Sequence, residues 1–215
     1  AVLATIGLYT LGGVNSTIAA LVALTIYGLG KTFFWPTMLA VVSERFPKGG
    51  AVTIGMVGGV GMLSAGLLGG PGIGFKQDKF ASESLEQNAP DTYTRYKAGK
   101  ENTFLFAFST NGLDGAKVAA LEDKGESIGK ELQILEDAGE SNENIEALNT
   151  WWQDAQGFAS EDEQPVKDAT LYGSRMALKL TAIVPAIMAI CYLLLLGYFK
   201  SIGGYKALTI EESKA

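Results

Sequence analysis

Hydrophobic and polar positions are segregated along this chain into long blocks. Residues 1–12 are apolar, residues 17–43 are apolar with one lysine, and residues 51–75 carry no charge. Residues 176–199 are again apolar with one lysine. A helix needs about 20 apolar residues to cross a bilayer core of about 30 Å, so the last three segments predict spanning helices. Residues 1–12 are too short, and predict the end of a truncated spanning helix.

Residues 76–175 form a polar block with a different pattern. Apolar positions recur at helical spacing in its segments 115–138 and 143–158, which predict helices. The block holds 20 acidic and 10 basic residues, whereas the net charge of the 215-residue chain is only -6. An acidic block is therefore inserted into an apolar, slightly basic chain. Trp151 and Trp152 are expected to anchor this block either to itself or to a membrane surface.

Together these blocks predict an all-α integral membrane protein. We expect a partial transmembrane helical bundle, with one truncated and three full spans, and a mainly helical extracytoplasmic insertion. The predicted parts are transmembrane helices in 1–75, the acidic insertion 76–175, the last span 176–199 and a tail 200–215. Because the chain begins inside an apolar run, we interpret it as a fragment that lacks the preceding helices.

The charges in the short loops predict an orientation. The turn 44–50 holds Glu44, Arg45 and Lys48, and the tail after residue 199 holds three lysines. Short loops rich in lysine and arginine face the cytoplasm, and two predicted crossings separate these two regions. We therefore expect the turn and the tail to be cytoplasmic and the insertion to lie outside, in a multi-pass protein of the plasma (inner) membrane.

Segment 51–75 contains nine glycines, a density that would destabilise a helix in water. In a membrane, small residues four apart let two helices approach closely. Gly55 with Gly59, and Gly66 with Gly70, have this spacing and are predicted helix-packing glycines. The alternative is a flexible glycine-rich loop, which the interleaved apolar side chains argue against.

The residue content excludes several kinds of site. The chain has no histidine and one cysteine, so it cannot form a histidine-based triad, a histidine-ligated metal site or a disulfide of its own. We expect no enzymatic activity, no cofactor, no bound metal and no nucleic-acid partner. The run Glu161-Asp162-Glu163 is interpreted as a solvated cap or linker rather than a metal or acid–base site.

Lys31 is the charge inside the segment 17–43. Gly30-Lys31-Thr32 resembles the end of a phosphate-binding loop, but that motif needs a glycine five residues before the Gly-Lys pair, where this chain has Thr25. The flanking residues instead predict one helix of about 40 Å with a kink at Pro36.

A lysine near the middle of such a helix costs about 2.5–3.5 kcal/mol to insert and is expected to face a cavity or a charged partner. Tyr27, Lys31, Phe34 and Trp35 have the spacing of one helix face and are our candidate residues for binding a small polar or anionic solute. The alternative is a buried ion pair between Lys31 and an acidic residue in the missing part.

The stretch "YGLGKTFFWPTMLAVVSERFPKGGA", followed by a glycine-rich segment ending "GGPGIGFKQD", a final helix and a short tail, resembles the last helices of the major facilitator superfamily. The resemblance implies that residues 1–12, 17–43, 51–75 and 176–199 are the ninth to twelfth helices of that family. The family's tenth helix lines its central cavity, which implies a substrate-facing role for Tyr27, Lys31 and Trp35. The block 76–175 is a departure from the family pattern.

These observations predict part of a secondary active transporter that moves a small polar solute by alternating access, coupled to protons or ions as in a symporter. Its expected partners are that solute, the lipid bilayer and the missing N-terminal bundle of the same protein. The alternative is a membrane-anchored binding or interaction protein whose working part is 76–175.

Overall fold

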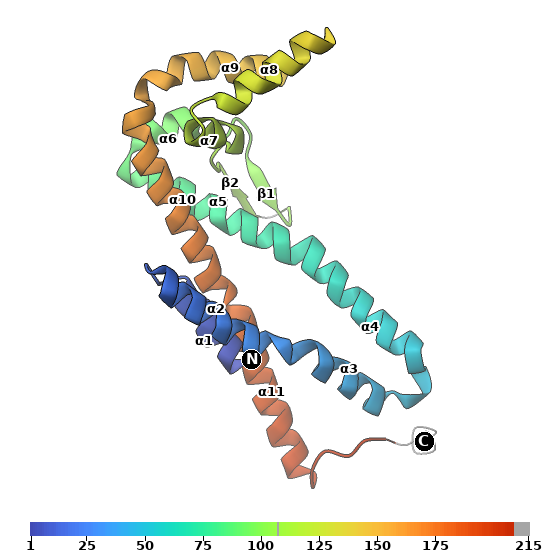
Figure 1. The fold of residues 1–215 in the computed structure, drawn as a ribbon. Helices are drawn as coiled ribbons and strands as arrows, with labels where there is room; N and C mark the ends of the chain where they lie inside the picture. The colour runs from blue at the N-terminus through green and yellow to red at the C-terminus, as the bar shows by residue number, and fades with distance from the viewer. Residues whose placement is uncertain (107, 209–215) are drawn as a thin grey trace. The chain divides into compact units, whose positions relative to one another are not determined.

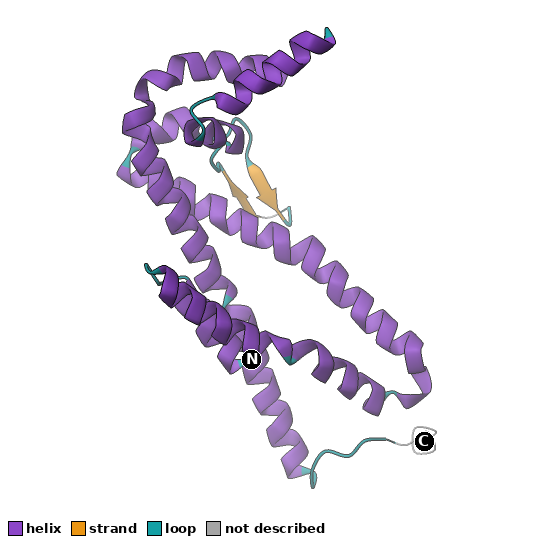
Figure 2. Ribbon diagram, viewed as in Figure 1, coloured by secondary structure: helices purple, strands orange, loops and turns teal. Residues whose placement is uncertain are grey.

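The computed structural model describes residues 1–106 and 108–208, which are mostly helical (Figures 1 and 2). The chain divides into two compact units. Unit 1 comprises Ala1–Ile73 and Ala177–Ala215, and unit 2 comprises Gly74–Met176. This division lies close to the expected limits of the polar block.

Unit 1 is built from apolar helices. Its elements are α1 (Val2–Leu11), α2 (Thr17–Thr32), α3 (Phe34–Arg45), η1 (Pro47–Gly49), α4 (Gly50–Ser64), η2 (Ala65–Gly69), the start of α5 (Gly70–Asn88), the end of α10 (Ala159–Thr181) and α11 (Ile183–Ser201). Three helical runs in the described residues are long and apolar enough to cross a membrane, namely Thr17–Arg45, Pro47–Asn88 and Glu143–Ser201.

The helical segments extend beyond the limits that the sequence predicts. The run that contains 51–75 continues to Asn88, and α10 begins at Ala159 rather than at 176. The expected ends at 75 and 176 are therefore wrong as helix ends. Hydropathy changes where apolar residues give way to charged ones. Helix propensity does not, because Lys, Glu, Gln and Ala all favour helices, so the helices continue past these points.

The breaks within the apolar helices lie just before prolines. α2 ends at Thr32 and α3 begins at Phe34, so the kink predicted at Pro36 is a break at Phe33. A proline has no N–H for the carbonyl four residues earlier, and its ring crowds that carbonyl. In this first break the residue four before the proline is Thr32, whose hydroxyl donates to the Gly28 carbonyl at 2.8 Å.

The same pattern occurs at the last apolar helix. α10 ends at Thr181 and α11 begins at Ile183, four and two residues before Pro185. Thr181 lies four residues before this proline, and its hydroxyl donates to the Ala177 carbonyl at 2.7 Å. A threonine bonded back to its own helix favours a bend. The π-helical η2 likewise precedes a proline, Pro71.

α1 and α2 pack through small residues. The side chains of Ala4 and Ala23 are 0% and 1% exposed. A Cβ placed on Gly7 would lie 2.5 Å from the backbone nitrogen of Tyr27, and one on Gly30 would lie 2.5 Å from that of Ala4. The two backbones therefore approach closely at both glycines, as small residues allow between apolar helices.

Unit 2 combines short helices with one hairpin. Its further elements are α6 (Pro90–Tyr96), β1 (Asn102–Phe104), β2 (Phe108–Thr110), α7 (Gly115–Glu122), α8 (Glu126–Ala138), α9 (Glu143–Ala155) and η3 (Gln156–Phe158). β1 and β2 are antiparallel, with Thr103 opposite Ser109 and Phe104 opposite Phe108. Among the described residues this hairpin is the one sheet, and Lys97 and Leu113 form an isolated antiparallel bridge beside it in the sequence.

A hydrophobic core holds unit 2 together. Its buried members are Leu85, Tyr96, Ala120, Leu121, Ile128, Trp152, Ala155, Val166 and Ala169. The ring of Trp151 meets Tyr96 edge-on, with centroids 5.4 Å apart. Both tryptophans therefore pack against unit 2 itself, which was one of the two roles expected for them.

The helix expected over 115–138 is two helices. Asp123 ends α7, and Lys124 and Gly125 have positive φ angles of 58° and 80°. Gly125 faces the indole of Trp152 so closely that a Cβ would collide with it. Asp123 accepts the backbone N–H of Gly125 at 2.9 Å and the hydroxyl of Ser127, and this hydroxyl bond lowers the pKa of Asp123.

Candidate functional site

Lys31 lies in the last turn of α2, beside an aromatic ring. Its Nζ is 5.8 Å from the centroid of the Tyr27 ring, within the range of a cation–π contact. Among residues 1–106 and 108–208, no carboxylate lies within ion-pair distance of Lys31, and its side chain is exposed. The structure thus brings together two of the four candidate residues.

The residues that resemble a phosphate-binding loop do not form a loop in the structure. Gly30, Lys31 and Thr32 are all helical residues of α2. A phosphate-binding loop instead directs free backbone N–H groups at its ligand, just before a helix begins. The structure therefore agrees with the exclusion of a nucleotide site at these residues.

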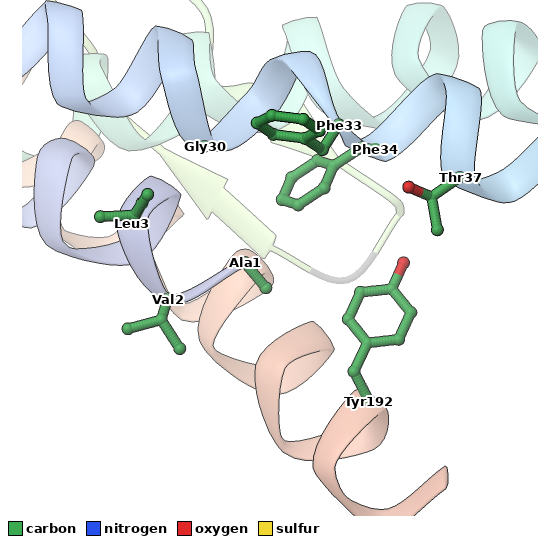
Figure 3. Close-up of a pocket in the computed structure, with 8 residues that line it drawn as sticks. All are labelled: Ala1, Val2, Leu3, Gly30, Phe33, Phe34, Thr37 and Tyr192. Atoms are coloured by element: carbon green, nitrogen blue, oxygen red, sulfur yellow. The ribbon is translucent and has the colours of Figure 1, made fainter. Parts of the chain in front are cut away.

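A pocket of about 400 Å³ lies at the break between α2 and α3 (Figure 3). Its lining residues are Ala1, Val2, Leu3, Gly30, Phe33, Phe34, Thr37 and Tyr192. Of the candidates, Phe34 lines this pocket, and Tyr27, Lys31 and Trp35 do not. The lining is apolar except for two hydroxyl groups, and Figure 3 shows the Tyr192 hydroxyl pointing towards Thr37.

Trp35 faces a different neighbour. A Cβ on Gly58 of α4 would lie 3.5 Å from the Trp35 ring, so the indole packs over this glycine. Phe34 and Trp35 therefore have different neighbours in the described chain, and a shared solute-binding face for Tyr27, Lys31, Phe34 and Trp35 stays a prediction. The break at Phe33 separates Tyr27 and Lys31, in α2, from Phe34 and Trp35, in α3.

The glycines that make close helix contacts are not the predicted ones. A Cβ at Gly55, Gly59, Gly66 or Gly70 would meet nothing within 4 Å in the described chain. The close approaches of apolar helices are at Gly7 and Gly30 instead. Since Gly7 and Gly30 lie in different helices, no repeat within one segment could have revealed them. A packing role for the four predicted glycines towards helices outside this chain stays a prediction.

The turn that holds Glu44, Arg45 and Lys48 lies against the tail that follows α11. The Tyr205 hydroxyl donates to Glu44 Oε2 at 2.8 Å, and the backbone N–H of Leu208 donates to the Glu44 carbonyl at 3.0 Å. This bond to Glu44 raises the pKa of Tyr205.

Arg45 completes the contact between this turn and the tail. Its guanidinium carbon lies 4.8 Å from the Phe199 ring centroid and 4.9 Å from that of Tyr205. The two rings also meet each other edge-on, with centroids 5.1 Å apart. The sequence predicts one side of the membrane for both regions, but it gave no sign that Tyr205 would contact Glu44. Lys48 belongs to η1.

Unit 2 contains a buried ionic cluster where the sequence predicted a solvated run. Asp162 is fully buried, and its carboxylate accepts both Arg95 Nε at 2.8 Å and Arg95 Nη2. The Thr92 hydroxyl donates to the same carboxylate at 2.8 Å. The interpretation of Glu161-Asp162-Glu163 as a solvated cap is therefore wrong for its middle residue, because Asp162 faces α6 while both neighbours face outward.

The arginine of this cluster makes contacts besides its bonds to Asp162. Its guanidinium also lies over the Phe158 ring at 4.6 Å, and the hydrogen bond to Asp162 raises the pKa of Arg95. The pair joins α6 to α10 through a carboxylate that is buried in the core of unit 2. We assign it a structural role.

Tyr96 lies next to this cluster in the core. Its hydroxyl is buried and has no hydrogen-bond partner among the described residues. Burial, and to a lesser extent the charge of Asp162, raises the pKa of Tyr96 to about 12. The phenol is therefore neutral over the physiological range.

No family model, curated protein or solved structure matches this chain. In the part of the chain that the structure describes, no group of three or more acidic or cysteine side chains is placed to hold a metal ion. The break between α2 and α3, with Lys31 on one side and the pocket on the other, is thus the candidate site that the geometry offers.

Proposed function

We propose that this chain is the membrane-embedded end of a secondary transporter for a small polar or anionic solute. The main observation in support is that the apolar helices are largely exposed. In each of the three long apolar runs, at most 11% of the most apolar window is buried within the chain. Side chains such as Val60, Leu194 and Leu196 are about two-thirds exposed. So large an apolar surface needs lipid or further apolar helices around it.

The position of Lys31 supports a transport role over a purely anchoring one. It lies in the last turn of α2, two residues before Phe33, where one apolar run is divided into two helices. Discontinuous membrane helices commonly form the solute sites of transporters, and an intramembrane lysine is a functional candidate by default. The resemblance to the major facilitator superfamily points the same way.

Lys31→Met tests this proposal, with Lys179→Met as the matched control. Both lysines lie over a tyrosine ring, Lys31 at 5.8 Å from Tyr27 and Lys179 at 5.9 Å from Tyr9. The full-length protein is reconstituted in vesicles, and uptake of radiolabelled sugars, sugar phosphates, monocarboxylates and dicarboxylates is measured. We expect Lys31→Met to abolish uptake that the wild type shows and Lys179→Met to retain it. Equal uptake by both variants would contradict the role of Lys31.

The second candidate is a membrane-anchored interaction protein with unit 2 as its working part. It is favoured by one observation, which is that unit 2 has its own core and its own buried ion pair. Vesicles that take up none of these solutes, together with saturable binding of a soluble protein that is lost on deletion of residues 89–158, would favour this candidate.

A further inference from the structure

The tip of the β1–β2 hairpin carries an exposed apolar cluster. Leu105 and Phe108 are 53% and 57% exposed, and Phe106 is completely exposed. Leu105 and Phe106 have φ angles of 52° and 58°, a region that turns normally fill with glycine or asparagine. The turn thus holds two large apolar side chains outward, in a position where polar turn residues are usual.

Two contacts fix the direction of this hairpin along α5. Asn102, the first residue of β1, donates its side-chain amide to Asp78 Oδ2 at 2.9 Å. Phe104, the last residue of β1, stacks on Phe75 with ring centroids 5.8 Å apart. β1 therefore runs antiparallel to α5, and its tip points towards the N-terminal end of that helix.

The N-terminal end of α5 is where the uncharged segment stops. Phe75 is the last residue of 51–75, and Lys76 and Asp78 begin the charged block. A helical segment of 25 residues is about 37 Å long, somewhat more than the bilayer core of about 30 Å. If 51–75 spans a membrane, Phe75 lies at its interface, and Phe104 lies at the same level.

The hairpin tip lies beyond Phe104 in the direction of the hydrocarbon. A strand advances about 3.3 Å per residue, so Leu105 and Phe106 reach at most about 7 Å past the level of Phe75. Apolar groups of interfacial proteins enter the boundary between headgroups and acyl chains to about 5–10 Å. The polar end of the hairpin, where Asn102 is bonded to Asp78, stays on the aqueous side.

We infer that the hairpin tip, formed by Leu105, Phe106 and Phe108, is a lipid-binding wedge that inserts into the outer surface of the bilayer next to the helix ending at Phe75. This inference rests on the proposed membrane span of 51–75. It gives unit 2 a second attachment to the lipid surface, in addition to its covalent links through α5 and α10.

The test places a polarity-sensitive fluorophore at the tip. On a background in which Cys191 and every other native cysteine of the full-length protein is replaced by Ser, Phe106→Cys is labelled with a nitrobenzoxadiazole group, and the protein is reconstituted in phosphatidylcholine and phosphatidylglycerol vesicles. Nitroxide lipids and aqueous iodide are the two quenchers. Glu140→Cys, in the exposed turn between α8 and α9, is the aqueous control, and Val60→Cys, in α4, reports on the span itself.

We expect nitroxide lipids to quench the label at 106 several-fold more strongly than the label at 140, and iodide to show the reverse order. A label at 106 that behaves like the one at 140, while the label at 60 is quenched by lipid, overturns the wedge and leaves the span intact. Absence of lipid quenching at 60 as well overturns both.

Phe106→Trp provides a second measurement that preserves the bulk of the side chain. Brominated lipids should quench a larger share of total tryptophan emission in this variant than in the parent, which has Trp35, Trp151 and Trp152 in residues 1–215. An equal share in the two proteins overturns the wedge, whatever the behaviour of the labelled variant.

Discussion

Asp162 offers the sharpest test of how unit 2 is held together. Its side chain is 0% exposed, and that of its partner Arg95 is 23% exposed. Asp162→Ala removes the carboxylate that accepts from Arg95 and Thr92, and leaves a guanidinium without its counter-ion. Breaking one partner of a buried ion pair costs about 3–5 kcal/mol. Because Arg95 retains some contact with water, we expect the free energy of unfolding to fall by about 2–4 kcal/mol.

This loss converts to a large change in the thermal midpoint. For a unit of roughly a hundred residues, 1 kcal/mol shifts the midpoint by about 4–8 °C, so Asp162→Ala should lower it by about 10–30 °C. Trp152 is in the core of unit 2, so its emission reports on this unfolding once Trp35 is replaced by Phe.

Glu163→Ala is the matched control, since Glu163 is the next residue on α10 and is exposed. An exposed substitution of this kind changes the free energy of unfolding by no more than about 0.5 kcal/mol. A midpoint for Asp162→Ala equal to that of Glu163→Ala would refute the assignment of a buried structural pair. The double variant Arg95→Met with Asp162→Leu removes both charges and should recover much of the loss, because it leaves no unpaired ion.

Three further predictions concern single residues. Gly30→Ala should lower the thermal midpoint in detergent because its methyl group meets the Ala4 backbone, whereas Gly28→Ala in the same helix has open space and should be neutral or stabilising by up to about 1 kcal/mol. Gly125→Ala should cost more than about 1 kcal/mol in urea unfolding, because φ is +80° there and the Trp152 indole blocks the site, while Gly129→Ala should not destabilise. Tyr96→Phe should be neutral or stabilising at pH 7. Because the folded pKa of Tyr96 is raised, its contribution is present below about pH 10 and is lost as pH rises towards about 12, so this variant should flatten the alkaline loss of stability seen in the wild type.

The sequence was sufficient to predict the positions of the apolar helices. Length and lack of charge identify a helix such as α4 without knowledge of its neighbours, because the bilayer sets the required length. Helix ends were harder to predict, since propensity continues where hydropathy changes. The helix that begins at Gly70 therefore runs through Phe75 into the charged residues that follow.

The candidate site could be predicted only in part for a related reason. Helical spacing correctly places Tyr27 beside Lys31 within one uninterrupted helix. Trp35 lies in the next helix, beyond the break that precedes Pro36, and packs over Gly58, a contact that helical spacing does not reveal. The proline itself was a visible signal, and the threonine four residues before it strengthens that signal. Tyr192 joins the pocket from α11, and such a contact between distant segments has no signature in a single sequence.

Asp162 shows another limit of pattern reading. In the run Glu161-Asp162-Glu163 all three residues look equivalent, yet only the middle one points inward from α10. Its partner Arg95 lies 67 residues earlier, in a seven-residue helix. An ion pair between residues so far apart in the sequence cannot be recognised from composition, because aspartate and arginine are both common on a solvated surface.

The breaks that precede Pro36 and Pro185 have a consequence for how these helices respond to their surroundings. A joint made by a missing N–H is a property of the covalent chain, so it exists whatever bundle surrounds it. The carbonyls of Thr32 and Thr181 lose the donors that a regular helix would supply. Each of these two apolar runs therefore consists of two helices that meet at Phe33 or at Ala182. We therefore expect bending of either run to concentrate at Phe33 or at Ala182, where a backbone hydrogen bond is missing.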